Sequence, residues 1–595
     1  MTNGSNSHTH NLYPNIIKDS STGSAGIVAG ELVAEDEGLI SIKTLGAHSY
    51  GAMESSSSKT SVNVTEESIG EAASMSEETQ FALPKAQLTM VISSLYMASF
   101  LAALDTTVVT TLLTVIASEL DAVENIGWIA TAYLLSCSAF QPLFGKLSDI
   151  FGRKVLLLVC CFFFAVGCCI CVTDSLLWLV VGRFVTGIGG SGLTTLGTIT
   201  MSDLIPLRER GLYQGLANIF FGLGAASGGI IGGLVSDALG WRYVFIIQVP
   251  LAVIVGSALW MFLNLPEGSP GLGSEGSEFK DKLKRVDFLG AIFLVSSLMI
   301  ILTAATLGGQ QFAYSSMTFI ALVVVSLMLL GSFVLTELFI SKEPIIPMNL
   351  MVERTVLASS LANWFYTMGT FVNLFYVPLF FQIVIGMSAT DSGLRLVTNF
   401  FAVSLGSVGA GLYMRQTGRY YNYAVIVGFL ALLGMANIIN LNANSAIVTQ
   451  FTVMLLPGFA YASILTITLL SLIAAVPVKY QACTTSIQYT FRATGSTLGV
   501  SIASAIFQAA TRSSLCEKLH QIISDEDLAN QILKRAMENT NYAKEAPEAI
   551  KEAIRSSYGL GCRGAFIFSA ICIFLGYISS LLMKEHVLHT NMNRD

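Results

Sequence analysis

Charged residues are scarce in this chain of 595 residues, and histidine is almost confined to its ends. Only 12% of the residues are charged, against about 25% in soluble domains. Apolar residues make up 53%, and the mean hydropathy is +0.66. The six histidines, at positions 8, 10, 48, 520, 586 and 589, all lie outside the long apolar runs. The composition excludes an ordinary soluble domain and predicts a polytopic membrane protein without intramembrane histidine relays.

Motifs of common enzymes are also absent. The chain has no phosphate-binding Walker sequence, no Gly-x-Ser-x-Gly elbow and no zinc-binding His/Glu spacing. We therefore expect no enzyme, no nucleotide-driven motor, no metal, no cofactor and no nucleic acid partner. We expect the protein to be a monomer. If it moves a small molecule uphill across the lipid bilayer, the energy must come from an ion gradient.

Apolar runs long enough to cross a bilayer, about 20 residues each, recur after residue 88. We count fourteen, at about 89–117, 127–144, 155–173, 176–200, 212–236, 243–263, 287–307, 315–340, 356–384, 393–413, 422–440, 447–475, 485–509 and 563–583. Short loops that carry Lys and Arg alternate with loops that carry almost none. Because basic loops stay in the cytosol, both ends of the chain are predicted to be cytosolic.

The segments outside the runs differ in composition. Residues 1–88 are rich in Ser, Thr, Gly and acidic residues, which predicts a disordered cytosolic tail. Within it, Glu35, Leu39 and Ile40 belong to a stretch that resembles acidic dileucine sorting signals, which adaptors read; the alternative is merely an acidic stretch. The loop 510–562 is predicted to be non-cytosolic and to contain a short amphipathic helix. Because oxidation is feasible there, we hypothesise a disulfide between Cys516 and Cys562.

One carboxylate interrupts the first apolar run. Asp105 has about ten residues on either side without another charge. Burying such a group at bilayer depth costs roughly 3 kcal/mol or more, so it usually faces a polar cavity, a partner or a substrate. Arg183 is the other ionisable residue predicted at comparable depth. Asp105 is therefore the leading candidate for proton coupling and cation binding, and a snorkelling or helix-capping Asp is the alternative.

The link between the second and third runs carries the most specific motif. Its residues Gly145, Asp149, Gly152, Arg153 and Lys154 match the G-x-L-x-D-x-x-G-R-[KR] signature, and on them the chain resembles the major facilitator superfamily. The link suits a gate, and a charged turn that obeys the positive-inside rule is the alternative.

Further stretches resemble the fourteen-span drug:proton antiporters of that family. Leu104–Val109 is similar to their first-span motif, and Trp128–Leu135 to their second span. In the fourth span the resemblance implies a role for Arg183 in proton transfer, with Thr186 where the family has glutamine. The fifth span resembles their antiporter motif through four glycines, with Gly229 where proline is usual: Gly224, Gly228, Gly232 and Gly233.

The resemblance implies an all-α membrane fold of two six-helix bundles and two extra central helices. The expected parts are the tail 1–88, a first bundle 89–263, a linker with two spans 264–355, a second bundle 356–583 and a cytosolic tail 584–595. Arg492 is expected to anchor at the cytosolic interface. Polar residues at mid-span depth are candidates for the substrate cavity, or else form interhelical hydrogen bonds: Thr106, Tyr133, Gln141, Asn218, Asn363, Trp364, Tyr366, Asn373, Tyr461 and Gln488.

Within this branch, the stretches 103–117, 129–133 and 141–154 look most like fungal vacuolar basic amino acid transporters. That resemblance implies antiport of lysine, arginine or histidine into the vacuole against protons. A lone carboxylate at Asp105 would then exchange between a proton and the cationic substrate. A plasma-membrane multidrug:proton exporter and a non-transporting sensor or interaction protein of the same fold are the alternatives.

Overall fold

The computed structural model falls into two units, Met1–Thr79 and Gln80–Asp595. It describes residues 31–34, 40–43, 83–120, 127–265, 269–274, 278–309, 312–523, 525–538 and 547–588. In the first unit, β1 (Glu31–Ala34) pairs antiparallel with β2 (Ile40–Lys43). Ile40 of the sorting candidate begins β2, whereas Glu35 and Leu39 lie outside the described residues.

The second unit is helical, and each expected apolar run lies on helix to within a few residues. Its long helices are α2 (Lys85–Glu119), α3 (Gly127–Phe151), α4 (Arg153–Ile170), α5 (Leu176–Leu204), α6 (Leu207–Leu239), α7 (Arg242–Phe262), α9 (Phe288–Leu307), α10 (Met317–Phe339), α12 (Arg354–Phe380), α13 (Ala389–Thr417), α14 (Tyr421–Ile439), α16 (Leu455–Ala475), α17 (Gln481–Ile522) and α20 (Glu548–Leu581). Shorter helices are α8 (Phe279–Lys284), α11 (Met348–Met351), α15 (Ile447–Thr452) and α18 (Glu526–Glu538), with short turns of helix at η2 (Pro270–Leu272), η3 (Phe381–Ile385) and η4 (Val478–Tyr480).

The number of spans is not confirmed at fourteen. Among the described residues, twelve helices are long and apolar enough to cross a membrane. The helices α3 and α17 are not among them, although both are long. Polar residues explain this: α17 opens with Gln, Thr and Ser side chains, and α3 ends in the charged motif.

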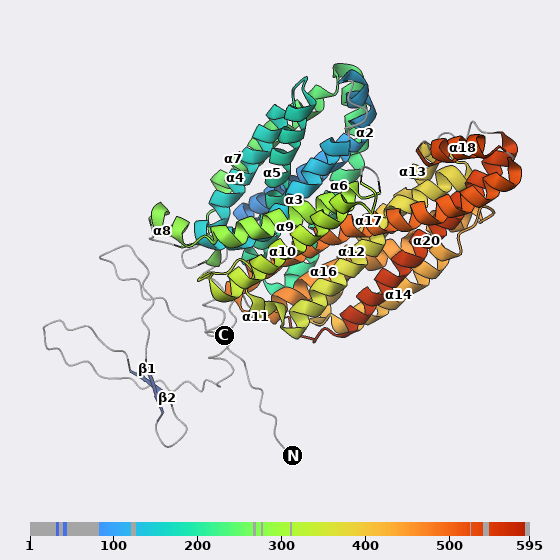
Figure 1. Ribbon diagram of the computed structural model, residues 1–595. Helices are drawn as coiled ribbons and strands as arrows, with labels where there is room; N and C mark the ends of the chain where they lie inside the picture. Colours follow the sequence, from blue (N-terminus) through green and yellow to red (C-terminus); the bar gives the residue numbers. More distant parts are fainter. Residues whose placement is uncertain are drawn as a thin grey trace, which may run out of the picture. The chain divides into compact units, whose positions relative to one another are not determined.

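The helices form two groups (Figure 1). Each group packs around its own apolar core. One core joins α2 to α7, with α2 against α6 and α7, and α5 against α3 and α4. The other joins α12, α13, α14, α16, α17 and α20. The two groups of helices, called here the first and second bundles, meet where α6 packs on α13 and α3 packs on α17. The pair α9 and α10 contacts both bundles, because α9 touches α3 and α17.

The expected loop 510–562 is largely helical. α17 continues to Ile522, α20 already begins at Glu548, and α18 is the predicted amphipathic helix between them. These segments share a small apolar core that includes Leu515, Ile532 and Ile554. The disulfide hypothesis is not borne out in the described structure: Cys516 and Cys562 are free thiols. Cys562 is fully buried inside α20 in the core of the second bundle, whereas Cys516 packs on the small core.

Candidate functional site

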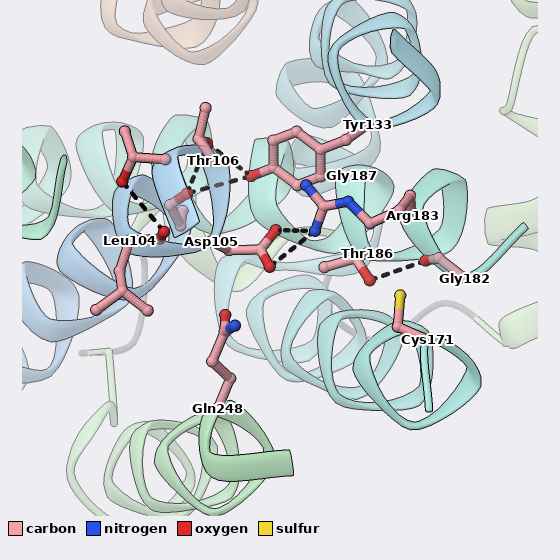
Figure 2. Close-up of polar contacts among 12 residues, drawn as sticks. Leu104, Asp105, Thr106, Tyr133, Cys171, Gly182, Arg183, Thr186, Gly187 and Gln248 are labelled. Atoms are coloured by element: carbon pink, nitrogen blue, oxygen red, sulfur yellow. Dashed lines mark hydrogen bonds and ion pairs between the residues drawn. The ribbon is translucent and has the colours of Figure 1, made fainter. Parts of the chain in front are cut away.

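Asp105 and Arg183 form a buried ion pair between α2 and α5 (Figure 2). Arg183 Nη1 donates to both carboxylate oxygens of Asp105, at 2.8 and 2.7 Å. The two side chains are 0% and 1% exposed. Since Asp105 lies twenty residues after the first residue of α2, it caps no helix end. The structure thus brings together the two residues that the sequence singled out.

Aromatic and polar side chains enclose this pair. The Arg183 guanidinium carbon lies 4.3 Å from the ring centroid of Tyr133 and 5.9 Å from that of Phe245, and such contacts stabilise a desolvated cation. Thr106 Oγ1 lies 3.3 Å from the Tyr133 hydroxyl, so both of these candidates belong to the same cluster. From α7, Gln248 points toward Asp105 (Figure 2).

Sequence reasoning missed Phe245 and Gln248. Gln248 could have been predicted, because it is the only amide side chain in the sixth apolar run, 243–263. Phe245 carries no such signal, because a phenylalanine in an apolar run is ordinary core. The pair also corrects one expectation: Asp105 is no lone carboxylate in a neutral cavity, because Arg183 already neutralises it.

The glycines of the fifth span bring α6 against α2 beside this pair. A Cβ added at Gly228 would lie 2.9 Å from the Leu104 carbonyl oxygen and would also meet the Thr107 hydroxyl. Gly224 abuts the Phe100 carbonyl in the same way, and Gly232 is buried. Gly233, by contrast, faces open space. The spacing therefore serves close helix packing at the first two glycines, and Gly233 takes no part in it.

The motif between α3 and α4 forms a network of ion pairs and hydrogen bonds inside the first bundle. Gly152 adopts a φ of 94°, a left-handed conformation that favours glycine and lets the chain turn directly into α4. Arg153 is 2% exposed and donates from Nη1 to Asp149 at 2.7 Å and from Nε to Asp203 at 2.9 Å. Asp203, at the end of α5, was missed by the sequence reasoning. Lys154 donates to Asn264 at 2.7 Å.

The same end of the molecule holds hydrogen bonds and close contacts between the bundles. A Cβ added at Gly145 of α3 would lie 2.6 Å from the Ala482 carbonyl oxygen of α17. Arg208 Nε donates to the Arg415 carbonyl at 2.7 Å, and Asn218 Nδ2 donates to Ser407 Oγ at 2.7 Å. The bundles are therefore closed against each other at the end that carries the basic loops.

Glu343 adds an ion pair at this closed end. It accepts from Lys146 at 2.9 Å and from Arg285 at 2.6 Å. The hydrogen bond from Arg285 is the main cause that lowers the pKa of Glu343 to about 2. A carboxylate whose pKa is lowered by folding contributes stability above its unfolded pKa and loses it only as pH falls through the folded pKa. This contact therefore stays ionised at neutral and at mildly acidic pH.

We expect Glu343→Gln to lower the free energy of unfolding modestly and by the same amount at each pH. The pair is about one-third exposed on the Glu343 side, and pairs of this kind contribute about 0.2–1 kcal/mol. The difference in thermal stability between the variant and the unaltered protein, measured in detergent between about pH 5 and pH 8, should stay constant. A difference that changes with pH in this range would place a titrating group in this contact.

A second polar site lies between the bundles. This central cavity is lined by Gln214, Asn363, Leu465, Leu469, Gln488, Tyr489 and Arg492. It has room for at most about one water molecule in this conformation. Asn363 and Gln488 were predicted to line a cavity. Arg492 was expected to anchor at the cytosolic interface, and this is corrected: its side chain lines the cavity because α17 packs between α3 and α12.

The remaining cavity candidates separate into two groups. Asn218 bonds Ser407 across the bundles, and Trp364 packs edge-on against Phe491 of α17. The others are buried and are not among the seven lining residues: Gln141 in α3, and Tyr366, Asn373 and Tyr461 in the second bundle.

Comparison with known proteins agrees with this architecture. Residues 95–500 match the Major Facilitator Superfamily. The chain is 35% identical to the vacuolar membrane amino acid uptake transporter fnx2 of Schizosaccharomyces pombe, over 84% of this chain and 85% of that protein. It is 33% identical to the multidrug resistance protein fnx1 of the same yeast, over 85% and 94%. It is 31% identical to vacuolar basic amino acid transporter 1 of Saccharomyces cerevisiae, over 76% and 83%.

Solved structures support the fold alone. The human organic anion transporter MFSD10 aligns with a TM-score of 0.50 at 14% identity, covering 82% of this chain and all of that one. The proton:xylose symporter XylE aligns with the same TM-score at 15% identity, covering 83% and 96%.

Proposed function

This chain belongs to the major facilitator superfamily, and we propose that it is a proton-coupled antiporter that moves lysine, arginine and histidine from the cytosol into the vacuole. It is a multi-pass membrane transporter of small molecules and not an enzyme. Proton coupling is supported by one observation, the fully buried Asp105–Arg183 pair. Amino acid transport and the vacuolar membrane are supported by the names of two relatives.

In the proposed cycle, Asp105 alternates between a proton and Arg183. A proton from the acidic lumen neutralises Asp105, so Arg183 loses the charge that holds it against α2. Since α2 also packs on α6, whose first turns contact α13, rearrangement at the pair reaches the contact between the bundles. Deprotonation toward the cytosol restores the ion pair. In this scheme the substrate cation does not have to reach Asp105.

The test is ATP-dependent uptake of radiolabelled lysine and arginine by vacuolar vesicles. Vesicles that contain the protein should accumulate both amino acids, and a protonophore should reduce uptake to the level of vesicles without the protein. A fluorescent fusion should label the vacuolar membrane, as expected if the stretch at Glu35, Leu39 and Ile40 binds a sorting adaptor. Uptake that survives the protonophore would contradict proton coupling.

A second candidate function is multidrug:proton export at the plasma membrane, which the 33% identity to multidrug resistance protein fnx1 favours. It predicts a fusion at the cell surface, drug sensitivity on deletion and no amino acid uptake by vesicles. The two functions therefore give opposite results in the same pair of assays. Binding without flux in liposomes would instead favour a sensor.

A further inference from the structure

Arg492 brings a positive charge into the central cavity. It lies on α17, and its guanidinium carbon is 5.9 Å from the ring centroids of both Phe221 and Tyr489. Within the part of the chain that the structure describes, no carboxylate pairs with it. Arg183 and Arg153 differ in this respect, because each of these buried arginines holds an aspartate. An arginine without a carboxylate partner can bind an anionic group of a ligand.

The same cavity contains two hydrogen-bond acceptors that receive no hydrogen bond. Gln214 is 4% exposed and Asn363 is 1% exposed, and in the described structure Gln214 Oε1 and Asn363 Oδ1 have no hydrogen-bond partner. Their nitrogens are engaged: Gln214 Nε2 donates to Asn218 at 3.3 Å, and Asn363 Nδ2 donates to the Gln488 carbonyl at 2.9 Å. These bonds orient both amide oxygens as the free acceptors. Buried acceptors without partners fit a ligand that donates hydrogen bonds.

We propose that this cavity binds the backbone groups of a free α-amino acid. Arg492 pairs with the α-carboxylate, whose two oxygens match the guanidinium fork, and the amide oxygens of Gln214 and Asn363 accept from the α-ammonium. The inference rests on the proposed function and names the site that selects its substrate class. Gln214 lies on α6, whereas Asn363 and Arg492 lie on α12 and α17. A bound amino acid therefore touches both bundles, and the narrow cavity must widen to admit it.

This site favours amino acids over organic cations in general. A cation without a carboxylate would face the unpaired guanidinium of Arg492 and would be repelled. Cadaverine, which is lysine without its carboxylate, and lysine methyl ester, which lacks the negative charge, therefore probe the site directly. In vacuolar vesicles that contain the full-length protein, unlabelled lysine and arginine should inhibit uptake of radiolabelled lysine, and cadaverine and the ester should not.

Three variants at two positions of one helix complete the experiment. Arg492→Gln should raise the KM for lysine and remove the discrimination against cadaverine, whereas Arg492→Lys should retain part of both. Arg512→Gln, an exposed arginine on the same helix, is the matched control and should change neither. Gel filtration of each purified variant verifies folding. The cadaverine competition is measured on the unaltered protein, so it does not depend on the folding of any variant.

The outcomes separate the two proposals. Lysine uptake that cadaverine inhibits as well as lysine does would overturn the carboxylate site and leave the transport function standing. An Arg492→Gln protein with unaltered KM and unaltered discrimination would overturn it as well. Vesicles that take up no amino acid would contradict the proposed function, and the site with it.

Discussion

Asp105→Asn should abolish proton-driven lysine uptake and markedly destabilise the protein. The substitution removes the negative charge but leaves Arg183 buried, 1% exposed and without a counter-ion. Breaking a buried pair in this way costs about 3–5 kcal/mol. Thermal unfolding of the purified protein in detergent should report the loss of stability, and uptake into proteoliposomes under an imposed pH gradient should report the loss of coupling.

A double variant separates these two effects. Asp105→Asn combined with Arg183→Gln removes both charges, so no unpaired ion remains and a large part of the lost stability should return. Coupling should not return, because the group that exchanges the proton is still missing. Asp237→Asn, which changes an exposed carboxylate on the neighbouring helix α6, is the matched control and should retain uptake. If the double variant still responded to the pH gradient, Asp105 would have no part in coupling.

The Asp105 site could be predicted because its signals are local. A lone carboxylate in an apolar run implies a partner or a cavity, and the partner Arg183 lies in a motif that the sequence also carries. Close packing by Gly224 and Gly228 followed from small residues at helical spacing. The two bundle cores likewise follow from apolar runs, whose faces must be buried against one another. These inferences need only hydropathy, spacing and the cost of a buried charge.

The central cavity could not be predicted in the same way. Arg492 was assigned to the interface because an arginine near the expected start of a span ordinarily snorkels to water. Its true position depends on where α17 packs, and that is set by residues hundreds of positions away. Gln214 was also missed, although it is an amide side chain within the expected run 212–236. It lies near the start of that run, where a polar residue is ordinarily close to water. The residue pattern along one helix does not predict which residues make contacts between the bundles.

In the proposed mechanism, proton exchange and substrate binding take place at two separate sites, whereas the sequence predicted that Asp105 and Arg183 serve both. The ion pair of Asp105 and Arg183 is internally neutral and closed within the first bundle, which suits a group that exchanges a proton. The cavity at Arg492 lies between the bundles, which suits substrate binding under alternating access. In the proposed cycle, communication between them passes through α6, which contacts α2 on one side and α13 on the other.

Gly411→Ala should test that route by preventing closure of the bundles. Gly411 of α13 lies against Gly211 of α6, and a Cβ added at Gly411 would be 2.5 Å from the Gly211 carbonyl oxygen and 2.7 Å from the Leu212 nitrogen. Both are backbone atoms, so the helices must separate. Overpacking of this kind costs about 1–3 kcal/mol, which would lower the ratio of closed to open protein by roughly 5- to 150-fold. Lysine uptake should fall as the closed state becomes less populated.

Cys483 provides the conformational readout for this variant. It is 4% exposed and lies on α17 beside Gly145, at the end where the bundles are closed. Its modification by a membrane-impermeant maleimide, measured by peptide mass spectrometry, should increase in Gly411→Ala. Gly393→Ala on the same helix, where a Cβ meets open space, should leave both uptake and labelling unchanged. Gly411 lies between the bundles and not inside one of them, so the variant acts on the contact between α6 and α13. If uptake were lost while Cys483 labelling stayed unaltered, closure at α6 and α13 would not control access to Cys483 from this side.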